Sequence, residues 1–204
     1  MSRYTGPRLR VMRALGIELP GLSRKSTERR PYPPGEHGGR RRRPDSVFGT
    51  QLKEKQKLKM NYGVTERQMR RLMKQARKSK TAAGIRLLEL LESRLDNAVF
   101  RAGFAPTIPA ARQLVNHGHF LLNGTKTDIP SAQIKPGDVV EVRNRSKDLE
   151  IIKTSLAQPS LVLAQWLSLE AENKKFTVTA SPDADSVPFA VEVQQVVEYY
   201  NTRM

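Results

Sequence analysis

The spacing of apolar and polar residues predicts helices over residues 46–80. The stretch 46–62 reads as one helix that ends before Gly63, because glycine at this point is a natural helix stop. Thr65 and Gln68 have the spacing of a capping box, and Val64 is placed to pack on Met69. The apolar residues that follow recur at helical spacing: Met69, Leu72, Met73 and Ala76. The pattern therefore predicts a second helix with one face in a core.

From residue 84 the pattern becomes that of a compact α+β module. A helical stripe runs from Ile85 to Ala102 and closes at Gly103. Another helix is predicted to begin near Thr107, with a proline in its first turn, and to stop at Gly118. Short apolar runs at 120–122 and 139–142 read as strands, the first followed by an Asn-Gly pair that favours a tight hairpin.

The C-terminal segment fits two patterns. Phe189, Val191, Val193 and Val197 alternate as in a strand, whereas Val193, Val196 and Val197 also suit one face of a helix. Because this segment is net acidic, we expect it to pack and complete a subdomain rather than to contact phosphates.

Composition adds a strong positive charge to this picture. The 204 residues include 36 Lys plus Arg against 20 Asp plus Glu, which gives a net charge of +16. The absence of cysteine excludes disulfides, cysteine nucleophiles and cysteine-ligated metals. No stretch reaches the roughly 18 apolar residues of a membrane span, and the start lacks a signal-peptide pattern. We therefore expect a soluble protein with a polyanionic partner, either nucleic acid or an anionic membrane.

The positive charge is concentrated in the first half of the chain. Residues 1–93 hold 24 basic and 8 acidic side chains, while residues 94–153 are net +3 and residues 154–204 net −3. We predict three parts: a basic, loop-rich arm (1–45), a helical subdomain (46–93) against which 155–204 packs, and the compact α+β module (94–154). This asymmetry favours one half that docks on a polyanion.

Two basic clusters are candidates for phosphate binding. Arg40 to Arg43 form a block of four like charges, which become favourable when phosphates neutralise them; the alternative is a disordered, solvated tail. The helix predicted after Thr65 carries six cations away from its apolar stripe, with Glu66 as its only carboxylate. An ordinary solvated face is the alternative here, but self-pairing cannot neutralise so many cations.

No catalytic constellation is found. The three histidines, His37, His117 and His119, lack the further ligands of a metal site, and Gly38-Gly39 lacks the spacing of a phosphate-binding loop. We expect no enzyme activity, no cofactor and no metal.

Several motifs resemble a known family. Residues 94–97 (RLDN), 110–115 (AARQLV), 117–119 (HGH), 122–124 (LNG) and 135–138 (KPGD) resemble the S4 RNA-binding domain. Outside this module, residues 3–8 (RYTGPR), 33–38 (PPGEHG), 51–58 (QLKEKQKL), 62–68 (YGVTERQ) and 197–200 (VEYY) resemble small-subunit ribosomal protein S4. The resemblance covers residues 1–154 and returns at the C-terminus.

The resemblance implies a structural protein of the small ribosomal subunit, which binds a junction in the 5′ domain of the ribosomal RNA and nucleates assembly. It also implies a role in translational accuracy and contact with mRNA, where mRNA enters the subunit, through Arg40, Arg41 and Arg43. Implied partners are ribosomal RNA, neighbouring ribosomal proteins and mRNA, in the cytoplasm or an organelle, with no membrane and no small-molecule substrate. Some relatives bind zinc through N-terminal cysteines, which this chain lacks.

The predicted RNA-binding residues fall into three groups. Those of the arm are Arg3, Tyr4, Arg8, Arg10, Arg13, Arg24 and Lys25. Those of the helical subdomain are Lys53, Lys55, Lys57, Lys59, Arg67, Arg70, Arg71 and Lys74. Those of the module, expected as an exposed polar set with a turn asparagine, are Arg94, Asn97, Arg101, Arg112, Gln113, His117, His119 and Asn123.

Three other functions would also suit parts of this sequence. An RNA-modifying enzyme built on the same module would need a separate catalytic domain, for which the remaining segments are too short. A stress-related or assembly factor would not need the motifs at both ends. A DNA-binding protein would explain the charge, but no recognition helix with base-reading side chains is evident.

Overall fold

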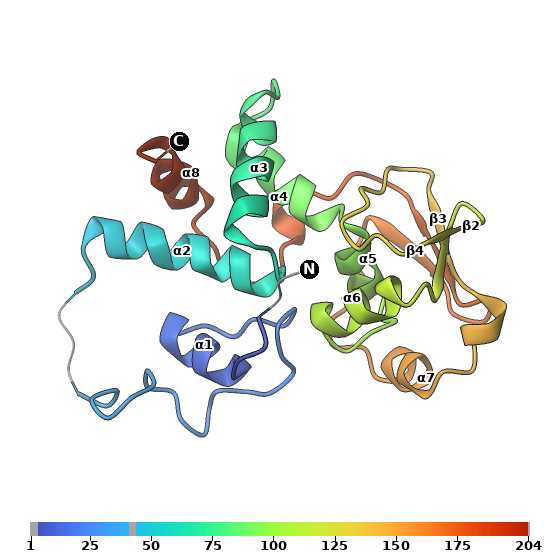
Figure 1. The fold of residues 1–204 in the computed structure, drawn as a ribbon, viewed down its shortest axis with the longest axis horizontal. Coiled ribbons are helices and arrows are strands. Elements are labelled where there is room, and N and C mark those ends of the chain that lie inside the picture. The colour runs from blue at the N-terminus through green and yellow to red at the C-terminus, as the bar shows by residue number, and fades with distance from the viewer. Residues whose placement is uncertain (1–3, 41–43, 204) are drawn as a thin grey trace. The chain divides into compact units, whose positions relative to one another are not determined.

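The computed structural model describes residues 4–40 and 44–203, and its backbone divides into two compact units (Figure 1). The first unit comprises the described part of Met1–Leu87 with Phe189–Met204, and the second unit is Leu88–Pro188. The division falls within helix α4 (Ala83–Glu92), which therefore connects the two units. Arg3, Arg41 and Arg43, which the sequence singled out, lie outside the described residues.

The first unit is built from helices that come from both ends of the chain. Helix α2 (Val47–Asn61) contacts α1 (Arg8–Leu15) and α8 (Val193–Asn201), and α8 also contacts α3 (Glu66–Arg77). The C-terminal segment thus takes the helical of its two predicted forms. It buries Val196 and Tyr200, so an apolar face holds it in the unit.

Part of the N-terminal arm packs into this unit. Met12, Leu19 and Leu22 form a buried cluster, against which Met60 of α2 and Phe189 pack. Asn61 accepts a hydrogen bond from the backbone of Gly21 at 2.9 Å. Residues 4–22 are therefore anchored by a small core of their own.

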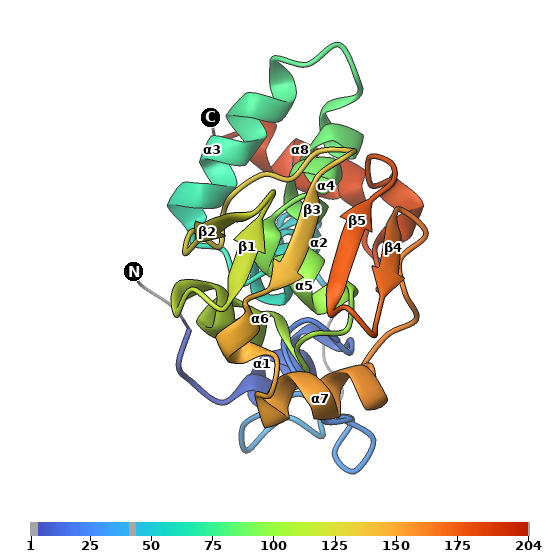
Figure 2. The same cartoon turned by 90° about the vertical axis from the view of Figure 1, so that its right-hand side faces the viewer.

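The second unit is an antiparallel sheet with helices on one face. Its five strands lie in the order β2-β1-β3-β5-β4, as Figure 2 shows, and helices α5 and α6 cover one side of the sheet. Phe104, which follows α5, packs edge-on against Phe120 of β1 and also contacts Phe176 of β5. The bounds of the elements are α5 Leu95–Arg101, α6 Ile108–Asn116, β1 Phe120–Leu122, β2 Thr125–Thr127 and β3 Val139–Val142.

The predicted hairpin is present, and the backbone of its turn explains why asparagine and glycine occupy it. Asn123 and Gly124 link β1 to β2 with φ angles of 51° and 79°. Both angles lie in the left-handed region, which asparagine and glycine tolerate best. The α+β fold class predicted from the sequence is thereby confirmed.

Two expectations from the sequence differ from the structure. Residues 155–188 were expected to pack on the helical subdomain, but strands β4 (Leu167–Glu170) and β5 (Lys175–Val178) extend the sheet of the second unit, with Phe176 opposite Val140. Helix α7 (Glu150–Ala157) and short 3-10 turns at Asn144–Ser146 and Ala184–Ser186 belong to this unit as well. Strand pairing between distant segments is the physical reason, because β5 and β3 satisfy each other's backbone hydrogen-bonding groups.

The helical stripe expected from residue 84 to residue 103 is also interrupted. Arg94 forms an isolated bridge with Gln133, and the Ile134 amide donates to the Ser93 carbonyl at 2.9 Å. These contacts accompany an extended backbone at Arg94, which separates α4 from α5. Finally, a search of the described residues reveals no helix with the length and apolar character needed to cross a membrane.

Candidate nucleic-acid interface

Helix α3 presents a row of cations on its exposed side. The helix starts at the predicted capping box, in which Thr65 accepts from the Gln68 amide and the Gln68 side chain accepts from the Thr65 amide. Met69, Met73 and Ala76 are buried on one side, as their spacing predicted. The opposite side carries four exposed cations: Arg67, Arg70, Arg71 and Lys74.

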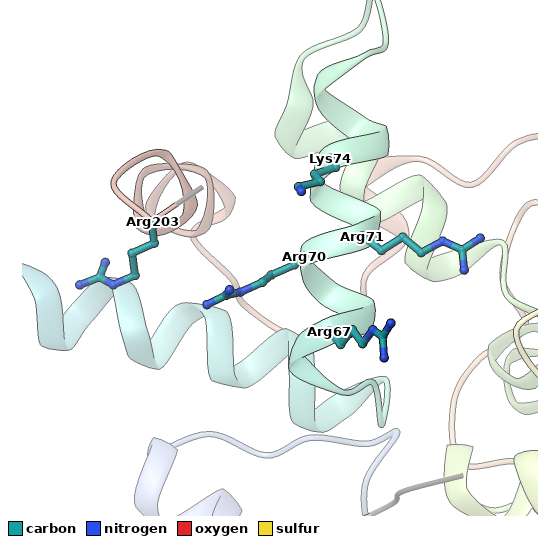
Figure 3. A pocket seen from close by; sticks show the side chains of 5 residues that line it. All are labelled: Arg67, Arg70, Arg71, Lys74 and Arg203. Carbon is teal, nitrogen blue, oxygen red and sulfur yellow. The ribbon is translucent and has the colours of Figure 1, made fainter.

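These four side chains line a hollow of about 420 Å³ together with Arg203 from the C-terminal turn (Figure 3). Within the part of the chain that the structure describes, no carboxylate lies within ion-pair distance of Arg67, Arg71, Lys74 or Arg203. Arg70 has one distant partner, Glu66, with 3.9 Å between its Nε and the nearer carboxylate oxygen. The hollow therefore gathers positive charge that the protein itself leaves largely uncompensated.

Glu66, the first residue of α3, links this helix to α2 and α8 through its carboxylate. Its Oε2 accepts from the Lys55 ammonium at 2.9 Å and lies 3.6 Å from that of Lys59, while Oε1 accepts from the Tyr200 hydroxyl at 2.9 Å. Burial alone would raise the pKa of Glu66. The hydrogen bonds from Lys55 and Tyr200 and the charges of both lysines outweigh burial and lower that pKa below its ordinary value. Burial, followed by the hydrogen bond to Glu66, raises the pKa of the Tyr200 hydroxyl.

The lysines of α2 are consequently less available than the sequence suggested. Lys55 is buried, with only 5% of its side chain exposed, and is neutralised by Glu66. Lys57 pairs with Glu54, and Lys53 pairs with Asp45. To bind these lysines, RNA phosphates would have to compete with ion pairs that already exist within the protein.

In the described part of the arm, the predicted residues divide into anchored and exposed side chains. Arg13 donates to the carbonyl of Tyr32 at 3.0 Å and stacks on its ring, and Arg8 donates to the carbonyl of Leu22 at 3.3 Å. Both therefore help to hold the arm's loops together. The exposed members are Tyr4, Arg8, Arg10, Arg24, Lys25 and Arg40, so Arg8 is both anchored and exposed.

Four predicted residues of the module are buried, so the expectation that they form an exposed polar set is wrong. Arg94 forms a two-pronged ion pair with Asp96, and Arg112 lies 3.9 Å from the same carboxylate. Asn97 donates to the Glu92 carboxylate at 2.8 Å. Arg101 lies 3.8 Å from that carboxylate, and it also donates to the Ser186 carbonyl. Buried charges need such partners, and Asp96 and Glu92 are each fully buried.

The remaining module candidates lie at the surface around the end of α6 and the hairpin. Gln113 and His117 are exposed, and His119 is partly buried with its Nδ1 2.8 Å from the Ser146 hydroxyl. Burial lowers the pKa of His119, and the nearby His117 and Arg143 lower it further. Asn123 is exposed, but its side chain bridges Asp138 and the Val139 amide and so supports the turn.

Sequence reasoning missed Arg203 as a member of the basic hollow. Its guanidinium lies 4.5 Å from the ring centroids of both Phe48 and Tyr199. The signal that could have found it is its position, because it follows the Tyr199-Tyr200 pair as a lone cation at the end of an acidic segment.

The candidate site is a charged surface on α3 and the C-terminal turn. Across residues 4–40 and 44–203, no group of three or more His, Asp or Glu side chains could hold a metal ion. An α+β fold with a basic helical face and a helix-and-sheet module defines the class of proteins that bind polyanions through their surface.

Comparison with known proteins identifies the family within this class. The family model "Ribosomal protein S4/S9 N-terminal domain" matches residues 3–92, and the "S4 domain" model matches residues 93–140. Proteins named small ribosomal subunit protein uS4 are similar over the full length of both chains: 56% identical in Methylobacillus flagellatus and 50% in a Synechocystis species, while uS4B of Nitrosomonas europaea is 54% identical. The chain belongs to the family of small ribosomal subunit protein uS4, a family of structural ribosomal proteins not known to be enzymatic.

Proposed function

We propose that this protein is a primary binder of small-subunit ribosomal RNA, which it contacts at the junction in the RNA's 5′ domain. The observation that supports this most directly is the hollow lined by Arg67, Arg70, Arg71, Lys74 and Arg203. Cations without internal partners gain most from contact with phosphates, because binding releases the counterions condensed on the RNA. Family membership supports ribosomal RNA as the partner, and other ribosomal proteins would be its neighbours in the subunit.

The mechanism is placement of cations against phosphates over a shape-matched surface. RNA helices offer phosphates and 2′-hydroxyls more readily than base edges, so a rigid basic face recognises their geometry. In this proposal the capping box of α3 and the Glu66 cluster supply that rigidity. They fix the helix before RNA arrives, so little ordering remains to oppose binding.

Binding of the purified protein to a transcript of the 5′ domain tests this proposal, with no other ribosomal protein present. We expect a clear preference for this transcript over unrelated structured RNA. In the double variant Arg67→Ala/Arg71→Ala, the negative slope of log affinity against log salt should become less steep by about 1.4–1.8, because each phosphate contact contributes about 0.7–0.9 to its steepness.

A charge-matched control is available in the second unit. Lys153 and Lys175 each pair with a carboxylate, Asp148 and Glu170 respectively, at 3.0 Å. The variant Lys153→Ala/Lys175→Ala removes the same two charges and should leave the slope nearly unchanged. Equal binding of unrelated RNA would contradict the assignment to ribosomal RNA, and equal slopes for both variants would contradict the role of α3.

We further propose that RNA binding by this protein nucleates assembly of the small subunit. A protein that binds the naked 5′ domain fixes the geometry of its junction, on which later proteins can then dock. The preformed helical face suits an early step, since α3 is capped by its own residues and packed on its own core.

The basic block after Gly39 supports a second part of the proposal, in which Arg40, Arg41 and Arg43 line the path along which mRNA enters and so influence translational accuracy. Arg40 is exposed. Replacing all three by alanine should leave the thermal unfolding temperature unchanged while altering mRNA unwinding or misreading in reconstituted subunits. Unchanged translation by the triple variant would remove this part.

A further inference from the structure

Arg203 lies against two aromatic rings that belong to different helices. The rings of Phe48 in α2 and Tyr199 in α8 are nearly parallel, with an interplanar angle of 22° and centroids 6.1 Å apart. The Arg203 guanidinium lies 4.5 Å from both ring centroids. Guanidinium groups are attracted to the faces of aromatic rings by the ring quadrupole, so the two rings together restrict its position.

The same guanidinium keeps hydrogen-bonding capacity. Its Nη1 donates to the Thr202 hydroxyl at 3.0 Å and to the Tyr199 carbonyl at 3.4 Å. Among the residues the structure describes, Nη2 has no acceptor, and no carboxylate forms an ion pair with Arg203. A cation that lies against aromatic rings, with no carboxylate partner among the described residues, is available to bind an anion.

Arg203 belongs to the wall of the basic hollow, where it joins two cations of α3. In Figure 3, Arg70 and Lys74 extend toward the side of α3 on which α8 lies, whereas Arg67 and Arg71 extend to the other side. Glu66, whose carboxylate lies 3.9 Å from Arg70, is engaged by Lys55, Lys59 and Tyr200. The α8 side of the hollow therefore combines three cations from two separate parts of the sequence.

We propose that Arg203 binds a phosphodiester group of the RNA backbone in a subsite beside Arg70 and Lys74, and that the aromatic pair Phe48 and Tyr199 positions Arg203 for this contact. The inference rests on the proposed function, because it gives the RNA a specific contact with the C-terminal turn. A planar guanidinium can offer two parallel N–H donors to phosphate oxygens, while lysine contributes a point charge. Phe48 and Tyr199 are positioning residues, since they act through Arg203.

Three variants test the subsite by their affinity for the 5′-domain transcript between 50 and 200 mM salt. Arg203→Ala should lose one phosphate contact. The factor by which its affinity falls between 50 and 200 mM salt should therefore be about threefold smaller than the factor for the wild type. Lys153→Ala removes the same charge from a lysine already paired with Asp148 and should behave as the wild type. Phe48→Leu keeps every charge and an apolar side chain, so a reduced salt dependence in this variant would reflect the positioning of Arg203 alone.

The outcomes separate the subsite from the wider function. Equal salt dependence of Arg203→Ala and Lys153→Ala would overturn the subsite, while a wild-type preference for the 5′ domain would leave the proposed function standing. Wild-type behaviour of Phe48→Leu would overturn the positioning role. If Arg203→Ala showed the reduced salt dependence but the wild type did not prefer the 5′-domain transcript, the subsite would stand and the ribosomal RNA assignment would be contradicted. Circular dichroism confirms that each variant is folded.

Discussion

Lys55 and Arg71 carry the same charge but have different roles, which their surroundings decide. Lys55 is buried in α2 and donates to Glu66 at 2.9 Å, so its charge is balanced within the protein. Arg71 is exposed on α3, and no ion pair within the described residues balances it. At the scale of single residues, availability for RNA therefore depends on the distance to the nearest carboxylate.

Glu66 should make the stability of the protein depend on pH in the acidic range. Its pKa is lowered in the folded state, so the carboxylate stabilises the fold above its ordinary pKa of about 4.5. That contribution is lost as pH falls through the folded-state pKa. Glu66→Gln should lower the free energy of unfolding at pH 7 by about 1–3 kcal/mol, since Lys55 loses a charged hydrogen-bond partner.

Urea unfolding at pH 7, 5, 4 and 3 measures this effect. The wild type should lose more stability between pH 5 and pH 3 than Glu66→Gln does. Glu172→Gln, which removes an exposed carboxylate in the β4–β5 turn, is the control and should follow the wild type. Parallel pH profiles for Glu66→Gln and the wild type would contradict the role assigned to Glu66.

The sequence predicts some of these site residues well and others poorly, for a physical reason. Arg67, Arg70, Arg71 and Lys74 lie opposite Met69 and Met73 by helical periodicity alone, so their exposure was predictable. Arg94 and Arg112 share Asp96, whose amide donates to the Pro130 carbonyl. Their burial depends on a segment some 35 residues away, which no local pattern reveals.

At the scale of elements, the correct predictions of helix starts and of the hairpin depended mainly on capping and turn residues. Thr65 and Thr107, the two predicted helix starts, cap α3 and α6, each accepting a hydrogen bond from an amide in the first turn of its helix. The break between α4 and α5 and the addition of β4 and β5 were not predicted. Both depend on backbone pairing between distant segments, and the apolar pattern alone does not specify such partners.

The contact between α4 and α8 depends on the absence of a side chain at Gly84. A Cβ atom at this position would lie 2.6 Å from Cγ1 of Val193 and 3.5 Å from Cγ2 of Val197. Gly84→Ala should therefore destabilise the first unit by about 1–2 kcal/mol through overpacking, despite the roughly 1 kcal/mol that alanine gains in a helix interior. Faster amide hydrogen exchange in α8 would report this loss.

Two further variants control for the helix propensity of alanine. At Gly49 in α2 a Cβ atom would meet its nearest neighbour at 3.4 Å, so Gly49→Ala should be neutral or mildly stabilising. Adding Val193→Ala should reduce the cost of Gly84→Ala, because the clashing methyl group is removed. If Gly84→Ala proved as harmless as Gly49→Ala, the close approach would not matter energetically.

At the scale of the whole molecule, net charge overstates the number of cations available to RNA. In the second unit, Arg94, Arg101 and Arg112 form ion pairs with the buried carboxylates of Glu92 and Asp96. In the first unit, α2 pairs its lysines while α3 leaves its cations exposed. The +16 of the chain is thus divided between internal ion pairs and a smaller set of side chains that face solvent.

The closure of the first unit by α8 has a consequence for biosynthesis. The second unit is one continuous stretch of sequence, and all its strands have been made once Val178 leaves the exit tunnel. The first unit begins earlier but lacks its last helix until Asn201 has been added. Domains usually complete their folding in the order of synthesis. Here we expect the reverse: the half that begins first finishes last, and its basic hollow is completed only after Arg203 has been added.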